Sequence, residues 1–366
     1  MASPVSFARG IPSADLLPIA EFGECARAVV ARDGAAILNY GPPGGYAPLR
    51  AWIAARHDVA PERVLVTTGS LQGFNFVARH FAAAHARVFV EAPCYDRSLG
   101  ILKRLGADVE SIPLGEDGMD VDVLADALER ASGPAVVYTI PTFQNPSGRT
   151  LSRESRNRLL DVARDREAVV LEDDPYGLLR FEGETLPTLF ELSAGTTLFL
   201  TSFSKTVAPG IRVGYLVVPD ELVAPMEGFV LENYVSPAIF VQAALHEFIE
   251  RGHFEPNVER IRLALRARRD AMIAALEREF PEGSRWSEPE GGYFLWIDLP
   301  TGVDADDVLA RATEAGVTFV KGADFYMGAG GEQALRLAFS FASVAEIEDG
   351  ISCLGGLVRE SVAVPA

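Results

Sequence analysis

The sequence has no apolar run long enough to cross a membrane, and it is poor in cysteine and histidine. Hydrophobic residues make up 48% of the 366 residues, but no run of them approaches the roughly 20 residues that a membrane helix needs. The three cysteines, Cys25, Cys94 and Cys353, are far apart and form no CxxC pair, which argues against a disulfide framework or a zinc site. The five histidines include no HExxH motif. We therefore expect no metal, no membrane partner and a reducing, cytoplasmic location.

Positive charge is also scarce, with 33 basic side chains against 51 acidic ones and a net charge of −18. An acidic surface repels phosphate backbones, so we expect no nucleic-acid partner. One basic stretch, "ERIRLALRARRD" at residues 259–270, interleaves arginines with apolar residues, and this spacing predicts a long helix with a solvated basic face. The first residues, "MASPVSFARGIPSADLLP", lack the charged and apolar regions of a signal peptide, so we expect none.

Several cofactor and nucleophile motifs are missing. The sequence contains neither GxGxxG nor GxxxxGKS/T, the fingerprints of dinucleotide and P-loop sites, and no GxSxG nucleophile elbow. Residues 202–205 (Ser-Phe-Ser-Lys) fit the SxxK motif of penicillin-recognising serine enzymes, but the partner motifs SDN and KTG are absent.

The sequence does contain short apolar runs that alternate with helical patterns from residue 46 to about residue 220. The runs are "RVLVTTGS", "ARVFVEAP", "AVVYTIP", "AVVLEDDP", "TTLFLTSF" and "RVGYLVVP". Buried strands that alternate with helices indicate a mainly parallel sheet covered on both faces. We predict an α/β fold with this sheet in a large domain, residues 46–270. A smaller α+β domain would follow at residues 271–366, and an N-terminal segment, residues 1–45, would pack on it.

Lys205 is one of only three lysines, and it follows the apolar run "TTLFLTSF" in a turn of small hydroxyl residues. In open parallel sheets, ligands bind at the carboxyl ends of the strands. The polar residues that directly follow the predicted strands are therefore expected at one edge of the sheet. They are Ser70, Tyr95, Asn145, Asp173, Tyr176, Ser202, Ser204 and Lys205.

This set of residues fits a lysine Schiff base with pyridoxal phosphate. Lys205 supplies the amine, and Asp173 can keep the pyridine nitrogen protonated. Asn145 and Tyr176 can hydrogen-bond the ring oxygen, and Tyr95 can stack on the ring. The phosphate would lie where "TTGSLQG" enters a helix, beside two hydroxyls and a charge. The residues on that side are Ser70, Ser202, Ser204 and Arg212.

The sequence resembles the class I/II aminotransferases, which are fold-type I pyridoxal-phosphate enzymes. It is most similar to the subgroup of 2-aminoadipate and kynurenine aminotransferases and the aminotransferase-like domains of MocR regulators. The matching stretches span almost the whole chain. They are "FARGIPSADLLP", "LNYGPPGGYAPLR", "TTGSLQG", "EAPCYDRSL", "PTFQNPSG", "LEDDPYG", "SFSKTVAPGIRVGY", "PEGGYFLWIDLP" and "ALRLAFSF".

The resemblance implies further roles. Leu71 would bind the phosphate through its backbone, and Arg336 would hold the substrate α-carboxylate in a bidentate grip. Tyr40 would reach the phosphate of a neighbouring subunit, which implies a homodimer with shared active sites. Gly10 and Ile11 would line the substrate pocket. Cys94 and Leu71 depart from the residues common in the family, and neither change removes a required chemical group.

The expected activity is therefore transfer of an amino group between an L-amino acid and a 2-oxo acid by a ping-pong mechanism, through an internal aldimine at Lys205. The catalytic residues would be Lys205, Asp173 and Tyr176. A β- or γ-elimination (C–S lyase), a decarboxylation or an oxidative deamination needs the same lysine and aspartate and stays open. A cofactor-sensing domain without activity is a third possibility; the resemblance begins within ten residues of Met1, where we expect no DNA-binding domain.

Overall fold

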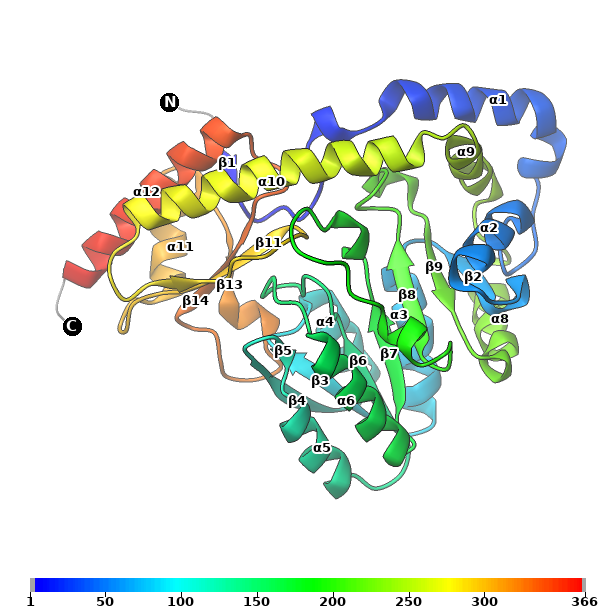
Figure 1. Cartoon of the computed structure of the whole chain (residues 1–366), viewed down its shortest axis with the longest axis horizontal. Helices are drawn as coiled ribbons and strands as arrows, with labels where there is room; N and C mark the ends of the chain where they lie inside the picture. Colours follow the sequence, from blue (N-terminus) through cyan, green and yellow to red (C-terminus); the bar gives the residue numbers. More distant parts are fainter. Residues whose placement is uncertain (1–3, 364–366) are drawn as a thin grey trace.

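The computed structural model describes residues 4–363 and divides into a larger part around an eight-stranded sheet and a smaller part around a four-stranded sheet (Figure 1). The large sheet has the order β2-β9-β8-β7-β6-β3-β4-β5. Neighbouring strands are parallel from β8 to β4, whereas β9 is antiparallel to both β2 and β8. The strands are β2 (Val64–Thr67), β3 (Arg87–Ala92), β4 (Asp108–Gly115), β5 (Gly118–Met119), β6 (Ala135–Thr139), β7 (Val169–Asp173), β8 (Leu198–Ser202) and β9 (Gly214–Val217).

The prediction of a mainly parallel sheet is confirmed, and all six apolar runs contain strands. Strand β4 was not predicted, because most of its residues are exposed or half-buried and they give no apolar run. Its place near the edge of the sheet explains that composition.

Helices cover both faces of the large sheet, and alternate strand residues contribute to opposite cores. Val88 and Val90 belong to the same apolar cluster as Phe74 of α3, whereas Phe89 between them belongs to a second cluster with Leu159 of α6. The helices of this part are α2 (Ala47–His57), α3 (Ser70–Ala83), α4 (Asp96–Leu105), α5 (Val121–Arg130), α6 (Arg153–Asp165), α7 (Leu189–Leu192), α8 (Asp220–Tyr234) and α9 (Ile239–Glu250).

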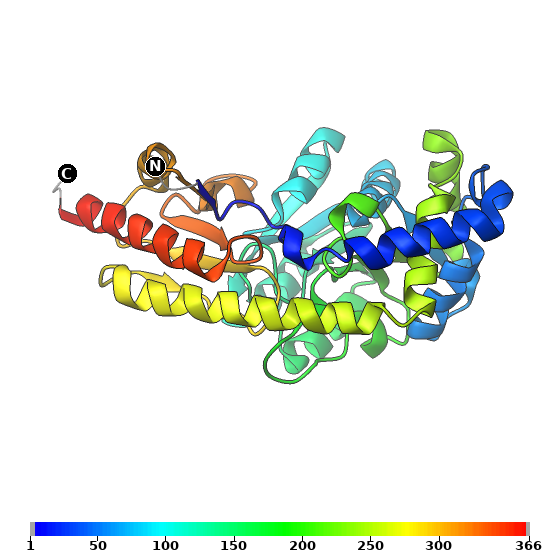
Figure 2. The ribbon, with the colours of Figure 1, turned by 90° about the horizontal axis from the view of Figure 1, so that it is seen from above.

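The smaller part contains an antiparallel sheet in the order β10-β11-β14-β13. Its elements are β10 (Arg285–Trp286), β11 (Phe294–Asp298), α11 (Ala305–Glu314), β12 (Val317–Thr318), β13 (Val320–Lys321), β14 (Ala334–Ala338) and α12 (Val344–Ala363). The long helix α10 (Phe254–Glu279) runs along both parts, beside α12 at one end (Figure 2). Residue 270, the expected domain boundary, lies inside α10. Residues 4–363 also contain five short 3-10 helices: η1 (Ala14–Leu16), η2 (Pro61–Arg63), η3 (Gly177–Leu179), η4 (Pro209–Ile211) and η5 (Gly322–Phe325).

The N-terminal segment contacts both parts of the molecule. Strand β1 (Val5–Ser6) pairs with β12 of the smaller part. Helix α1 (Ile19–Ile37) instead packs on α9 of the larger part, because Val29 and Ile37 share an apolar cluster with Ile239. The segment between them, residues 8–17, crosses from one part to the other (Figure 2). Among residues 4–363, no helix is long and apolar enough to cross a membrane.

Candidate active site

A cavity of about 560 Å³ lies where the carboxyl ends of the central strands face the smaller part. Thirteen of the fourteen predicted site residues line it. They are Gly10, Ile11, Ser70, Leu71, Tyr95, Asn145, Asp173, Tyr176, Ser202, Ser204, Lys205, Arg212 and Arg336. The fourteenth, Tyr40, is 79% exposed on the connection between α1 and α2 and does not line the cavity formed by residues 4–363.

Lys205 follows β8 and extends its amine into this cavity. Its Nζ donates a hydrogen bond to the carbonyl oxygen of Gly10 at 2.5 Å and lies 5.2 Å from the ring centre of Tyr293. Burial lowers the pKa of Lys205 to about 8, and the charges of Arg336 and Arg212 act in the same direction. The neutral amine, which is the form that acts as nucleophile and base, is therefore available near neutral pH.

Asp173 ends β7 and is buried beside the cavity. Its Oδ2 accepts a hydrogen bond of 3.0 Å from the hydroxyl of Tyr138, which is also 3.0 Å from the Ser98 hydroxyl. Its Oδ1 has no hydrogen-bond partner among residues 4–363. Burial raises the pKa of Asp173 to about 7, although the bond from Tyr138 opposes this rise. A buried carboxylate with one unpartnered oxygen fits the protonated nitrogen of a pyridine ring.

The start of α3 forms an anion cradle with two serines and an arginine. The residue before the helix, Gly69, has φ 77° and no side chain to cap the first turn, so the N-terminal N–H groups are open to a ligand. A Cβ atom on Gly69 would collide with the guanidinium of Arg212. The Ser202 hydroxyl donates to that of Ser204 at 2.7 Å, and Arg212 lies 3.5 Å from the latter. Helix dipole, hydroxyls and guanidinium together suit a phosphate group.

Arg336 brings a guanidinium group into the cavity from β14 of the smaller part. One terminal nitrogen donates to Oδ1 of Asn145 and the other to the carbonyl of Ala8, both at 2.9 Å. Its Nε is buried and unpartnered within the described chain. Burial lowers the pKa of Arg336 to about 10, so the side chain remains charged at neutral pH. The free Nε fits a carboxylate ligand.

The loop that contains Asn145 is held by a buried carboxyl group that sequence reasoning missed. Glu91 of β3 accepts hydrogen bonds from Thr139 at 2.6 Å and from the Gln144 amide at 3.0 Å, and Gln144 in turn accepts from the backbone of Ser147. Burial raises the pKa of Glu91 to about 7. A lone acidic residue inside the run "VFVEAP" is the signal that could have identified it, because a charge in a buried strand needs partners.

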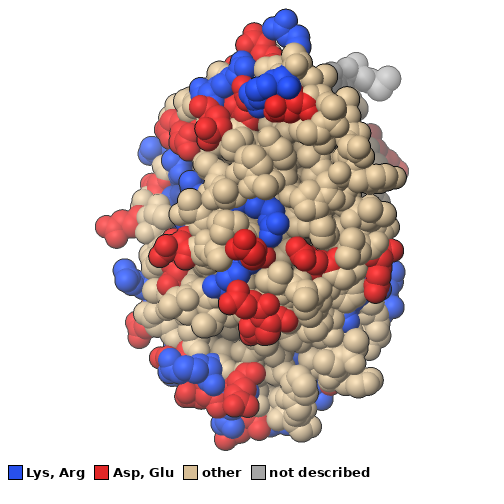
Figure 3. Space-filling view, turned by 90° about the vertical axis from the view of Figure 1, so that its right-hand side faces the viewer, with Lys and Arg blue, Asp and Glu red and all other residues tan. Residues whose placement is uncertain are grey.

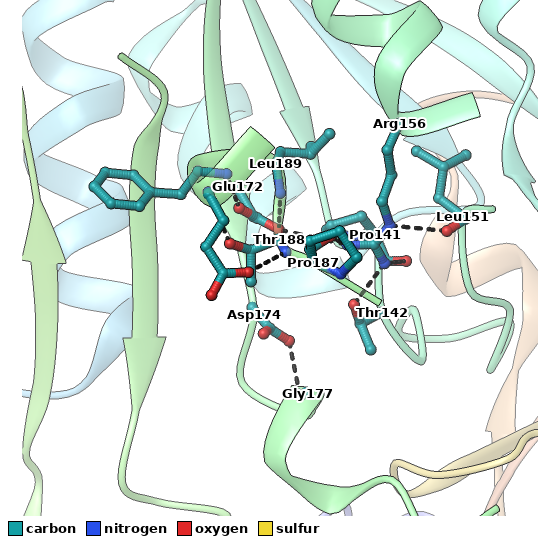
Figure 4. A network of polar contacts seen from close by, with 12 residues as sticks. Pro141, Thr142, Leu151, Arg156, Glu172, Asp174, Gly177, Pro187, Thr188 and Leu189 are labelled. Carbon is teal, nitrogen blue, oxygen red and sulfur yellow. Dashed lines mark hydrogen bonds and ion pairs between the residues drawn. The ribbon is translucent and has the colours of Figure 1, made fainter. Parts of the chain in front are cut away.

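A second buried network fixes the loops behind the site (Figure 4). The guanidinium of Arg156, fully buried, donates to the carbonyls of Leu151, Pro141 and Pro187 at 2.8–3.0 Å. Glu172, 3.9 Å from Arg156, accepts from the backbone N–H groups of α7. Glu172 directly precedes Asp173, so the network holds the end of β7 as well as the loop that follows β6.

The aromatic residues line the cavity on several sides. Tyr176 packs against Tyr293 and Phe294, with ring centres 5.6 Å and 5.8 Å away. Burial raises the pKa of Tyr95 to about 12, so its hydroxyl stays protonated. Among residues 4–363 no three histidine, cysteine or acidic side chains lie together as a metal site would require.

The chain is similar to known aminotransferases over almost its whole length. The family model for class I and II aminotransferases matches residues 10–354. A 2-aminoadipate transaminase from Thermus thermophilus is 38% identical over 98% of this chain and 91% of its own. Aromatic-amino-acid aminotransferase 1 from Thermococcus litoralis is 33% identical over 98% of this chain and 88% of its own.

A solved structure gives a similar result. LysN, an α-aminoadipate aminotransferase from Thermus thermophilus complexed with N-(5'-phosphopyridoxyl)-L-leucine, superposes with a TM-score of 0.94 at 36% identity. The match covers 98% of this chain and 93% of that one.

Proposed function

The chain belongs to the class I and II aminotransferases and is a pyridoxal-phosphate enzyme, and we propose that its cavity at the ends of β7 and β8 is where the amino group is transferred. The observation that carries this proposal is a lysine amine that shares one cavity with two buried side chains, each of which has one polar atom without a partner among residues 4–363, Asp173 Oδ1 and Arg336 Nε. The first suits the ring nitrogen of the cofactor, and the second suits the α-carboxylate of an amino acid.

The cofactor fits the residues present. Asp173 would face the ring nitrogen, Asn145 and Tyr176 the ring oxygen, and Tyr95 the ring face. The phosphate would be held by the cradle, whose members are Ser70, the backbone of Leu71, Ser202, Ser204 and Arg212. When bound, pyridoxal phosphate carries the amino group between the two substrates and withdraws electrons from the carbon that loses its proton.

Lys205 and Arg336 act on the substrate. Arg336 orients the amino acid by its carboxylate, and its bond to Asn145 keeps the guanidinium plane fixed. With the pKa lowered to about 8, Lys205 Nζ can accept the α-proton as a neutral amine and donate it again as an ammonium. The amino acid and the 2-oxo acid would then react in turn at the same site.

We further propose that the amino donor has an apolar or aromatic side chain. The N-terminal segment and the smaller part contribute apolar residues to the cavity wall, Ala8, Ile11, Phe294, Val320 and Phe325. Three charged residues, Asp96, Arg97 and Asp324, also line the cavity, and Arg97 lies 3.4 Å from Asp96, which offsets its charge. Arg9, which could have read a second carboxylate, is exposed and lies over the Phe341 ring. One relative is named for aromatic amino acids, and the LysN structure contains a leucine adduct, which supports this class. The Thermus thermophilus transaminase and LysN are named for 2-aminoadipate, whose side chain ends in a carboxylate, so this amino acid is the competing donor in the test below.

The functional unit that we propose is a homodimer with shared sites. Gly41 N donates to the Ser236 hydroxyl at 3.2 Å, which joins two loops whose apolar side chains Leu38, Tyr40 and Val235 are exposed. We call this surface the apolar end; its members are Leu38, Tyr40, Leu231 and Val235. A second copy of the chain would cover it and receive the Tyr40 hydroxyl in its phosphate cradle.

The visible spectrum of the purified protein, followed while single amino acids are added, tests the activity. We expect a yellow protein that one apolar or aromatic amino acid bleaches and that 2-oxoglutarate restores. Lys205→Ala should lose the absorption band and all turnover, whereas Lys103→Ala, a change on the exposed face of α4, should lose neither.

Full turnover by Lys205→Ala would disprove the role of this lysine. Release of ammonia, pyruvate or carbon dioxide without bleaching would assign the site to a lyase or decarboxylase instead.

A further inference from the structure

The arginine-rich stretch of α10 contains two buried residues, Arg268 and Arg269. The prediction of a solvated basic face is wrong for both, because each guanidinium is bound by carbonyl and acidic oxygens of other segments. Burying a guanidinium away from water is costly unless its donors are satisfied, so these contacts need an explanation. Arg268 contacts segments that reach the active-site cavity, although it does not itself line that cavity.

Arg268 links the N-terminal segment to the chain just after β14, the strand that carries Arg336. One terminal nitrogen donates to the carbonyl of Ser340 at 2.7 Å, and the other donates to the Ser13 hydroxyl at 2.8 Å and lies 3.3 Å from Asp15. The Ser340 hydroxyl in turn donates to the carbonyl of Ile11 at 2.9 Å. We call residues 8–17 the strap.

The part of the strap that reaches the cavity, Ala8 to Ile11, is held through its backbone. The carbonyl of Ala8 accepts from Arg336, and that of Gly10 accepts from Lys205. A Cβ atom at Gly10 would lie 2.5 Å from Phe294, so the strap backbone is in close contact with the cavity wall. A backbone so close to two functional side chains must be placed accurately, because small displacements change how the substrate is aligned.

We propose that Arg268 is a positioning residue for substrate binding. It ties Ser13 of the strap to Ser340, four positions after Arg336, and so fixes Gly10 and Ile11 relative to the guanidinium that receives the carboxylate. This inference rests on the proposed function of the cavity. Arg268 acts through the strap and makes no contact with the proposed cofactor cradle, so its effect is on the binding of the amino acid.

The matched control is the neighbouring Arg269. It is as buried as Arg268, at 7% exposure each, on the same helix, and it is as well bonded. Its partners are the Pro289 carbonyl, Glu182 and Asp270, none of which belongs to the strap. A general effect of removing a buried arginine from α10 would therefore appear in both variants.

The experiment compares Arg268→Met, Arg268→Lys and Arg269→Met in the cofactor-loaded protein. For Arg268→Met we expect the KM for the donor amino acid to rise about tenfold while kcat and the cofactor absorption band change little, because hydrogen bonds that orient the binding site are lost. Arg268→Lys retains the charge, so its KM should rise less than that of Arg268→Met. Arg269→Met should leave the KM unchanged.

Hydrogen exchange gives a second measurement that does not depend on turnover. Without substrate, the peptide covering residues 4–17 should exchange faster in Arg268→Met than in the unaltered protein or in Arg269→Met. If Arg268→Met does not fold, the variant Ser13→Ala, which removes the hydrogen bond from Arg268 to the strap, is used in its place in both measurements.

Equal KM changes in Arg268→Met and Arg269→Met, or unchanged exchange in the strap, would overturn the proposal. If the unaltered protein shows no transamination at all, the proposed function fails, and the exchange measurement alone then decides whether Arg268 holds the strap.

Discussion

The Tyr138 hydroxyl determines how Asp173 can act on the cofactor. It donates to one carboxylate oxygen, at 3.0 Å, and leaves the other free. Since burial raises the pKa of Asp173 to about 7, the carboxyl group is close to taking up a proton at neutral pH. A hydrogen bond donated to the ionised form opposes this, so Tyr138 helps to keep the charge that pairs with a protonated ring nitrogen.

Tyr138→Phe should raise the pKa of Asp173 further. A carboxyl group whose pKa is raised in the folded state contributes stability below its unfolded pKa and loses it as pH rises through the folded value. In the protein without cofactor, the free energy of unfolding of Tyr138→Phe should therefore fall further below that of the unaltered protein as pH rises above about 7. The additional loss should be about 1.4 kcal/mol for each unit by which the pKa of Asp173 is raised further.

Urea unfolding at pH 6 and pH 8.5 measures this difference. In an Asp173→Asn background, the effect of Tyr138→Phe should be independent of pH. A deficit with the same pH dependence in both backgrounds would show that Tyr138 acts on another group.

The sequence predicted the residues that end strands far better than those inside them. Lys205, Asp173 and Asn145 follow apolar runs, so topology alone places them at one sheet edge, and the structure places all three along one cavity. Tyr138 lies within the run "AVVYTIP", where an aromatic residue is predicted to belong to the hydrophobic core. Its role depends on which way the hydroxyl points across the sheet, and this follows only from the packing of Ser98 and Asp173 around it.

At the scale of elements, helix α10 shows where pattern reasoning stops. The spacing of apolar residues and arginines at residues 259–270 predicted a long helix, and α10 spans Phe254–Glu279. Periodicity assumes one solvated face, whereas α10 is covered by the strap, by the segment around Pro289 and by α12. Whether an arginine on such a helix meets solvent or a carbonyl is decided by segments far away in the sequence.

Arg156 should be the most stabilising arginine of the larger part. Replacing it by Met leaves the carbonyls of Leu151, Pro141 and Pro187 without their donor and Glu172 without its nearest opposite charge. We expect the free energy of unfolding to fall by about 3–5 kcal/mol, the usual cost of breaking a buried pair on one side. Chemical denaturation of the protein without cofactor measures it.

A double-mutant cycle separates the charge pair from the carbonyl bonds. Burial raises the pKa of Glu172 to about 8, so the cycle is measured above that pH, where the carboxylate is charged. Glu172→Gln then removes the charge, so Arg156→Met should cost less in that background than in the unaltered protein. Additive losses would show that the pair at 3.9 Å contributes nothing beyond the hydrogen bonds to the loops.

At the scale of the whole molecule, the net charge disfavours association of two copies of the chain, whereas the exposed apolar residues of one end favour it. With a net charge of −18, two copies of the chain repel each other in solution. The end of the molecule at α1, α2 and α8 nevertheless presents a broad uncharged field between groups of charged residues (Figure 3). Salt weakens the repulsion and leaves apolar burial intact, so the proposed dimer should tighten as ionic strength rises.

The variant Tyr40→Phe tests whether each active site of the proposed dimer contains residues from both subunits. Tyr40→Phe retains the exposed ring but removes the hydroxyl that would bind the partner's phosphate group, so the affinity for pyridoxal phosphate should fall about tenfold. Mixing this variant with Lys205→Ala forms hybrid dimers. In each hybrid, the site that contains Lys205 receives an intact Tyr40 from its partner, and half of the sites should regain full affinity.

Absorption titrations with the cofactor, together with sedimentation at low and high ionic strength, measure both effects. Mixing Tyr40→Phe with the double variant Lys205→Ala/Tyr40→Phe is the matched control, because no site in that hybrid combines Lys205 with an intact tyrosine. Recovery in the control as well would mean that mixing itself improves binding. A monomer at every ionic strength, or an unchanged affinity in Tyr40→Phe, would mean that each chain binds the phosphate with its own residues alone.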